Sequence, residues 1–125
     1  MKERYGVVIV GGGPAGMFAA LELVQSNGLG VLLVEKGRDI ENRLCPVRDS
    51  GLPCRSCSPC NLVCGLGGAG AFSDGKLVFS TSVGGYLPEY LGEANTARLL
   101  EYVKKLWQEF GAGTHVYGDG DIARE

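Results

Sequence analysis

The sequence lacks the features that mark membrane and nucleic-acid-binding proteins. No apolar run approaches the roughly 18 residues that a membrane-spanning helix needs. The formal net charge is only −2, so there is no basic footprint for nucleic acid or for an anionic membrane. The N-terminus lacks the apolar region and cleavage site of a signal peptide. We therefore expect a cytoplasmic protein with no nucleic-acid and no membrane partner.

Histidine is also scarce. The single histidine, His115, lies in a glycine-rich stretch with no nearby partner, and we expect it on the surface. What is abundant is glycine, with 21 residues, and all five cysteines lie within 20 positions of one another, between Cys45 and Cys64. Glycine of this frequency without a repeat indicates backbone that passes close to another group.

Residues 5–35 have the order of a strand, a glycine turn, a helix and a second strand. Residues 6–10 are apolar and mostly β-branched, which is typical of a strand buried on both faces. The pattern G-x-G-x-x-G follows directly. Residues 31–34 are again apolar and predict the second strand. This order predicts a Rossmann-like βαβ unit, with a tight turn that binds no nucleotide as the simpler alternative.

Each glycine of the pattern has a separate expected role. Gly11 permits the sharp turn out of the strand, Gly13 lets the backbone approach a pyrophosphate, and Gly16 lets the helix pack closely on the strand. Pro14 suits the first turn of a helix, whose free N–H groups form an anion site. The turn residues that we expect to contact a cofactor are Gly11, Gly12, Gly13, Pro14, Ala15 and Gly16.

An acidic residue ends the second strand at the position where a ribose is bound in such units. Glu35 lies 35 − 16 = 19 positions after Gly16, close to the spacing of about 20 that is typical of the ribose-binding carboxylate. Lys36 follows it and is a further candidate. The carboxylate suits a ribose diol and disfavours a 2′-phosphate, because the two would carry like charge.

Two segments resemble a known family of flavoproteins. VVIVGGGPAG at residues 7–16, with Glu35 and Lys36, resembles the FAD-binding start of flavoproteins that have two dinucleotide-binding domains. CGLGGAGAFSDGKL at residues 64–77 is similar to a narrower group, the poorly characterised FAD-dependent dehydrogenases of bacteria and archaea. The resemblance implies FAD as cofactor, oxidoreductase activity, and a small-molecule substrate or electron carrier as partner.

The resemblance also assigns residues beyond the first motif. It implies that a second glycine segment lies along FAD, and that a basic residue soon after the acid, Arg43, contacts the cofactor. The residues assigned to this second segment are Gly67, Gly68, Gly70, Ala71 and Ser73. The alternatives are a flexible linker for the segment and a solvated charge for Arg43. Asp74 and Lys76 predict either a positive charge near the flavin or an ion pair that closes a turn.

The fold class we expect is α/β, a Rossmann-like FAD/NAD(P)-binding βαβ start with an incomplete doubly wound sheet. A full sheet of this kind has about five or six strands, and only two are evident. We therefore expect residues 1–125 to be the N-terminal portion of a longer enzyme, inactive alone, with a cysteine-rich insert at about 44–64. An amphipathic helix is predicted at about 95–110, capped by Asn95 or Thr96, and a strand at 77–83.

The cysteine spacing suggests metal or redox chemistry. The residues Cys54, Cys57, Cys60 and Cys64 have the spacing C-x2-C-x2-C-x3-C, which is found in iron–sulfur proteins. Four thiolates also suit zinc, and Cys45 is an alternative ligand. Three further hypotheses stay open: a flavin-linked disulfide oxidoreductase that uses Cys60 and Cys64, a non-enzymatic nucleotide- and metal-binding module, and inert thiols. The sequence identifies no catalytic residue and no oligomeric state.

Overall fold

The structure, a computed structural model, describes residues 4–113. The surface position predicted for His115 therefore lies outside the described residues. The chain divides into two compact units, Met1–Lys76 and Leu77–Glu125. No helix within the described range is both long and apolar enough to cross a membrane.

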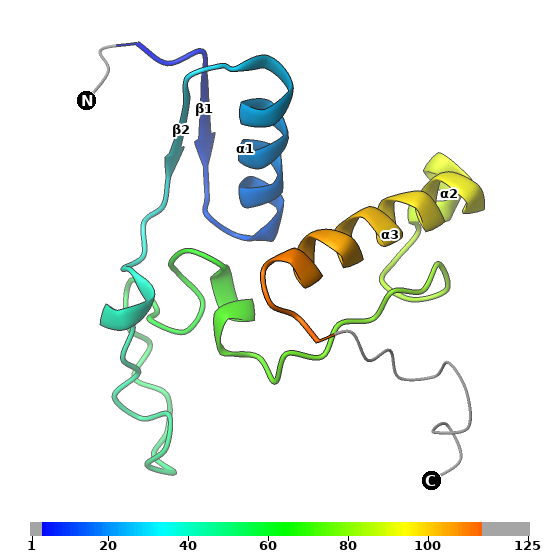
Figure 1. The fold of residues 1–125 in the computed structure, drawn as a ribbon. Coiled ribbons are helices and arrows are strands. Elements are labelled where there is room, and N and C mark those ends of the chain that lie inside the picture. The colour runs from blue at the N-terminus through cyan, green and yellow to red at the C-terminus, as the bar shows by residue number, and fades with distance from the viewer. Residues whose placement is uncertain (1–3, 114–125) are drawn as a thin grey trace, which may run out of the picture. The chain divides into compact units, whose positions relative to one another are not determined.

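The first unit begins with the βαβ arrangement that the sequence predicts. Strand β1 (Val7–Val10) leads through the glycine turn into helix α1 (Pro14–Asn27), and strand β2 (Val31–Val34) returns beside β1 (Figure 1). The strands are parallel, with Val7 opposite Val31 and Val10 opposite Val34. Helix α1 starts at a proline and is capped at its C-terminus by Gly28, whose φ of 57° is left-handed. The predicted two parallel strands and connecting helix are confirmed.

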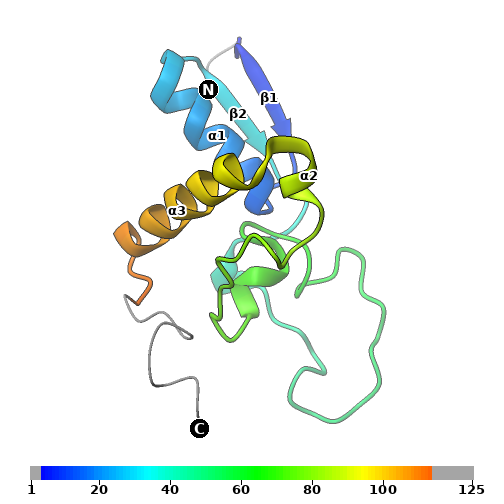
Figure 2. The ribbon, with the colours of Figure 1, turned by 90° about the vertical axis from the view of Figure 1, so that its right-hand side faces the viewer.

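Helix α1 covers one face of this two-stranded sheet (Figures 1 and 2). Val7 and Ile9 are half-buried, whereas Val8 is 56% exposed and Val10 83% exposed. Alternate residues of a strand point to opposite faces, so one face packs on the helix and the other is open. The expectation of a strand buried on both faces is not met, because among residues 4–76 no helix or strand covers the second face. No hydrophobic residue in the described range is fully buried.

A long irregular segment follows β2. It contains two short 3-10 turns, η1 (Ile40–Asn42) and η2 (Gly68–Phe72), and residues 43–67 between them form neither helix nor strand. In Figure 2 this part of the chain runs out in a wide excursion and then returns. Its two ends, and not its middle, contribute to the site described below.

The second unit contains helix α2 (Leu87–Leu91) and helix α3 (Glu93–Glu109). The predicted strand at 77–83 is wrong, since the segment is irregular. Its serines turn the chain instead: the Val83 N–H donates to the Ser80 carbonyl at 3.3 Å, and the Ser82 N–H donates to the Ser80 hydroxyl at 3.2 Å. Such local side-chain bonds compete with a strand ladder.

Helix α3 lies where the sequence places a helix at about 95–110. It begins two residues earlier, with Gly92 as N-cap. The predicted caps lie inside the helix and bond back by one turn, the Asn95 amide to the Leu91 carbonyl at 2.7 Å and the Thr96 hydroxyl to the Gly92 carbonyl at 3.0 Å. Thr96 is only 2% exposed. The prediction that Asn95 or Thr96 caps the helix is therefore wrong, because the helix begins before both residues.

Candidate functional site

The first glycine turn presents the N-terminus of α1. The Gly11 N–H donates to the Val34 carbonyl at 2.8 Å, which ties the turn to the end of β2. Gly13 is the N-cap of α1, in extended conformation, and makes no side-chain cap hydrogen bond. The first N–H groups of a helix have no partner within it. With Pro14 at the helix start and Ala15 exposed beside it, the turn has the form of an anion-binding site.

Gly13 and Gly16 differ sharply in their surroundings. A Cβ at Gly16 would lie 2.0 Å from the Gly11 carbonyl oxygen and 3.3 Å from Cγ2 of Ile9, whereas a Cβ at Gly13 would meet nothing within 4 Å. Gly16 therefore permits the close packing of α1 on β1. Gly13 instead leaves open space at the helix N-terminus, where a ligand could approach the backbone.

Glu35 connects three backbone segments through its carboxylate. Oε2 accepts from the Gly12 N–H at 2.6 Å, and Oε1 accepts from the N–H groups of Gly37 and Gly65, each at 2.9 Å. These donors come from the first glycine turn, the segment after β2 and the second glycine segment. A carboxylate has about four acceptor positions. A backbone hydrogen bond from Lys36 acts on the same carboxylate, so backbone donors from four residues surround it.

The ionised form of Glu35 should stabilise the fold. The hydrogen bond from Gly12, followed by that from Gly37, holds the pKa of Glu35 below its usual value of 4.5. Stability from such a group is complete above the unfolded-state pKa and is lost as the pH falls through the lower folded-state pKa. We expect the unfolding temperature of the wild type to fall on acidification from about pH 6 to about pH 3, and that of Glu35→Gln to fall less.

A pair of thermal unfolding series measures this difference. Glu41→Gln, which changes an exposed carboxylate on η1, is the matched control and should keep the acid sensitivity of the wild type. Equal acid sensitivity of Glu35→Gln and the wild type would show that the three backbone bonds give the carboxylate no preference for its ionised form.

The second glycine segment lies directly against the first turn. The Gly67 N–H donates to the Gly12 carbonyl at 2.8 Å, and a Cβ at Gly68 would lie 3.9 Å from the Gly13 Cα. Gly12 is thus held on both sides, by Glu35 at its N–H and by Gly67 at its carbonyl. The structure brings Gly67 and Gly68 to the predicted site. Gly70 and Ala71 follow in η2, where Gly70 faces open space.

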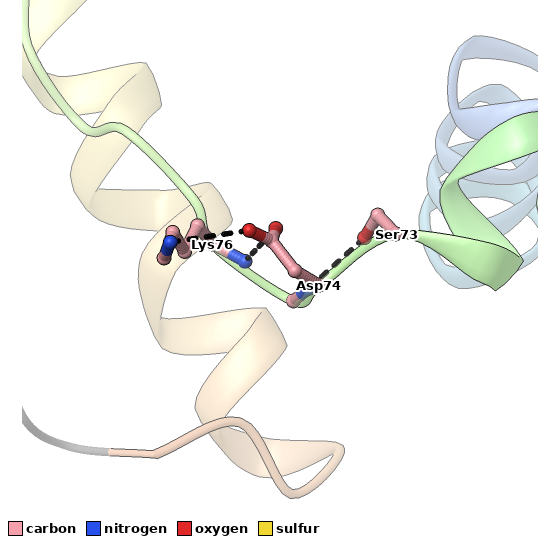
Figure 3. Close-up of polar contacts among 4 residues, drawn as sticks. Ser73, Asp74 and Lys76 are labelled. Carbon is pink, nitrogen blue, oxygen red and sulfur yellow. Dashed lines mark hydrogen bonds and ion pairs between the residues drawn. The ribbon is translucent and has the colours of Figure 1, made fainter.

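Ser73 and the residues after it form a closed local turn. The Ser73 hydroxyl accepts from the Gly75 N–H at 3.1 Å, and Asp74 accepts from the Lys76 N–H at 3.2 Å (Figure 3). The Lys76 ammonium lies 3.2 Å from the other Asp74 oxygen. Of the two hypotheses for this pair, the turn-closing ion pair is the one the structure contains. Lys36, next to Glu35, is exposed.

Arg43 has an environment that the sequence did not indicate. It was predicted to contact the cofactor, but its side chain is only 2% exposed, and four of its N–H groups are taken by backbone carbonyls. Arginine has five N–H donors, so at most one remains for a phosphate. Its guanidinium carbon lies 4.8 Å from the ring centre of Phe72. Arg43 is a buried structural side chain in this unit.

Gly37 is a site residue that sequence analysis missed. A Cβ at this position would lie 2.1 Å from the Gly65 nitrogen and 2.2 Å from the Cys64 carbonyl carbon. Backbone packs on backbone at this point, which places the Gly65 N–H beside the Glu35 carboxylate. Gly37 lies two residues after Glu35 in the sequence, but no local pattern identifies residues 64–65 as the segment that contacts it.

The cysteines are not gathered into a metal site. Within residues 4–113, no three His, Cys, Asp or Glu side chains are arranged to hold a metal ion. Cys54 and Cys57 are exposed in the irregular excursion, whereas Cys45, Cys60 and Cys64 are half-buried, and all five thiols are free. The predicted iron–sulfur or zinc site at Cys54, Cys57, Cys60 and Cys64 is therefore not supported. Sequence spacing alone does not fix the path of an irregular segment.

Cys60 is chemically distinct among these thiols. The Val63 N–H and then the Leu62 N–H lower the pKa of the Cys60 thiol from its usual value of 9.0, with the charge of Arg43 adding to them. The thiolate is the nucleophilic form. We expect the alkylation rate of Cys60 by iodoacetamide, followed by mass spectrometry, to reach half its maximum at a lower pH in the folded protein than in urea. The same midpoint in both would contradict this prediction.

Part of this chain is similar to known proteins. The sequence model of the pyridine nucleotide-disulphide oxidoreductase family matches residues 5–54, which include both strands, the first glycine turn and Glu35. An uncharacterized protein of Clostridium beijerinckii is 46% identical over 70 residues, which are 56% of this chain and 13% of that relative. The chain therefore matches only a small part of the relative's length. No solved structure matches. The residues matched by the family model coincide with the βαβ unit and Glu35, so the similarity lies in the Rossmann-like segment.

Proposed function

We propose that this chain is the FAD-binding portion of a FAD-dependent oxidoreductase that acts as a dehydrogenase. The observation that carries the proposal is the junction at Gly12, where Glu35 accepts from the N–H and Gly67 donates to the carbonyl of the same residue. This junction places a carboxylate, a helix N-terminus and two glycine segments around one position. Those are the groups that a dinucleotide requires for its ribose and its pyrophosphate.

The residues present fit such a cofactor. The open space at Gly13 would admit a pyrophosphate to the N-terminus of α1, whose dipole favours negative charge. Glu35, directly after β2, would present its carboxylate to a ribose hydroxyl. Gly67 and Gly68 would form the second wall. When bound, FAD supplies hydride or electron transfer, and the residues of this chain bind and orient it.

The choice of FAD over a nicotinamide cofactor rests on the resemblance of residues 7–16 and 64–77 to flavoproteins. Glu35 disfavours a 2′-phosphate by like charge. We further propose a cytoplasmic location and a small-molecule substrate or soluble electron carrier as partner. The proposal assigns no metal to the cysteines.

An anaerobic absorption spectrum and FAD titration of the full natural protein that carries this chain test the proposal. We expect a two-band flavin spectrum, and we expect Gly13→Ala to weaken FAD binding about tenfold or more, since the Cβ would fill the approach of the pyrophosphate. Its unfolding temperature should stay near that of the wild type, because nothing in the protein lies within 4 Å of that Cβ.

Gly113→Ala is the matched control, because Gly113 also faces open space but belongs to the second unit. It should leave FAD binding unchanged. Absence of bound flavin and of FAD affinity in the full protein would overturn the assignment of the cofactor. Iron and zinc assays on the same sample test the cluster hypothesis separately, and stoichiometric metal would revive it.

A further inference from the structure

Arg43 is a buried cation in a unit whose residues 4–76 include no fully buried hydrophobic side chain. Arg43 and Thr96 are the fully buried side chains within the described range, and Arg43 belongs to the first unit. Burial of a charge is unfavourable unless hydrogen bonds compensate for the lost water. The compensation at Arg43 comes from backbone carbonyls. A buried arginine in this setting indicates that the backbone around it must hold one conformation.

The guanidinium joins two functional parts of the chain. Two of its carbonyl partners belong to the turn between Cys60 and Cys64, and two belong to the second glycine segment. The four bonds are Nε to Asn61 at 3.0 Å, Nη2 to Leu62 at 2.7 Å, Nη1 to Leu66 at 2.9 Å and Nη2 to Gly68 at 2.8 Å. Because the guanidinium is a rigid plane, these bonds fix the distance and angle between the two parts.

The stem of Arg43 and its surroundings are equally constrained. A Cβ at Gly65 would lie 2.7 Å from Cδ of Arg43 and 2.8 Å from its Nε, so only glycine lets the stem pass. On another side the Phe72 ring lies 4.8 Å from the guanidinium carbon, within the range of a cation–π contact. The side chain is therefore closely surrounded from Cδ to the guanidinium.

Residues 65–68, which Arg43 holds, contact the residues of the proposed dinucleotide site. Gly65 donates to Glu35 at 2.9 Å, and Gly67 donates to the Gly12 carbonyl at 2.8 Å. We propose that Arg43 is a positioning residue of the dinucleotide site: it holds residues 65–68 against the first glycine turn and does not contact the cofactor. The ligand's identity in this inference rests on the proposed function.

A neutral and a charged substitution separate positioning from charge. Arg43→Met removes all four donors, and Arg43→Lys keeps the charge but replaces the planar fork by one ammonium with three donors. In both variants we expect amides of residues 61–70 to exchange hydrogen faster in the ligand-free full protein, while amides of α1 keep wild-type rates. We expect FAD binding to weaken about tenfold or more, because the loop is no longer pre-organised.

Arg48→Met is the matched control. The Arg48 guanidinium carbon lies 5.1 Å from the same Phe72 ring, but the side chain is exposed. It should leave both exchange and FAD affinity near the wild type. Ethylguanidinium at low millimolar concentration should restore slow exchange in Arg43→Ala, since it fits the vacated carbonyl site, while ethylammonium should restore less.

The two readouts distinguish the possible failures. Unchanged exchange at residues 61–70 in both Arg43→Met and Arg43→Lys would overturn the positioning role, whatever FAD does. Faster exchange in α1 as well as in the loop would also overturn it, because Arg43 would then stabilise the whole unit only. If the wild type binds no FAD, the proposed function fails, and the exchange data still decide whether Arg43 fixes the loop.

Discussion

Replacement of Gly16 by alanine is expected to destabilise the first unit by about 3 kcal/mol or more, because the added carbon collides with main chain and cannot be accommodated by a rotamer change. The Cβ would lie 2.0 Å from the Gly11 carbonyl oxygen and 3.2 Å from its carbonyl carbon. Relief requires α1 to move away from β1. Thermal unfolding of the full protein should show a midpoint lower by about 10 °C or more.

Gly13→Ala is the control for this prediction. It places the same methyl group in the same turn, three residues earlier, with nothing within 4 Å. Its unfolding midpoint should remain near that of the wild type while its FAD affinity falls. This is a binding defect without a loss of stability. A Gly16→Ala protein with the stability of the wild type would mean that α1 and β1 do not pack as closely as described.

Replacement of Gly37 by alanine should have an effect of similar size through a different contact. The Cβ would lie 2.1 Å from the Gly65 nitrogen and 2.5 Å from the Cys64 carbonyl oxygen, so the two chain segments must separate. Separation breaks the bond between Gly65 and Glu35, at present 2.9 Å. We expect a loss of about 3 kcal/mol in stability, together with weaker FAD binding.

Gly70→Ala provides the comparison for Gly37→Ala. Gly70 belongs to the glycine-rich stretch that also contains Gly65, the partner of Gly37, and a Cβ at Gly70 meets nothing within 4 Å. It should unfold like the wild type in calorimetry. If Gly37→Ala also did so, the backbone contact between residues 37 and 64–65 would not exist in solution, and the second glycine segment would have to be held by Arg43 and Gly67 alone.

The parts of this fold that could be predicted are those set by local sequence. The strand–turn–helix–strand order depends on apolar runs and on glycines at fixed offsets, and both strands and α1 occur as predicted. The apolar spacing of residues 99–110 likewise located α3. Glu35 was selected by its distance from the glycine turn, and the structure places its carboxylate at that turn, 2.6 Å from the Gly12 nitrogen.

The parts that could not be predicted depend on partners far along the chain. Arg43 bonds to carbonyls 18 to 25 residues later, and Gly37 packs against Gly65. Carbonyl groups occur at every residue, so no side-chain pattern marks the ones that Arg43 uses. The cysteine spacing is a local pattern, and it failed to predict a metal site because it does not fix the path of the irregular segment that carries the thiols. The strand predicted at 77–83 is absent for another reason. Strand propensity alone does not supply a second strand for it to pair with.

The carboxylate of Glu35 also closes a loop, because its partner Gly65 lies 30 residues further on. The entropy of closing a loop rises only slowly with length, by about 0.6 kcal/mol for each doubling. When Arg43 and Gly65 hold the two ends of this loop, the number of residues in the exposed excursion between them has little effect on the entropic cost of closing it. Residues 46–59 are thus a place where the chain can gain or lose many residues at small thermodynamic cost, and where an inserted peptide would leave the glycine segments undisturbed.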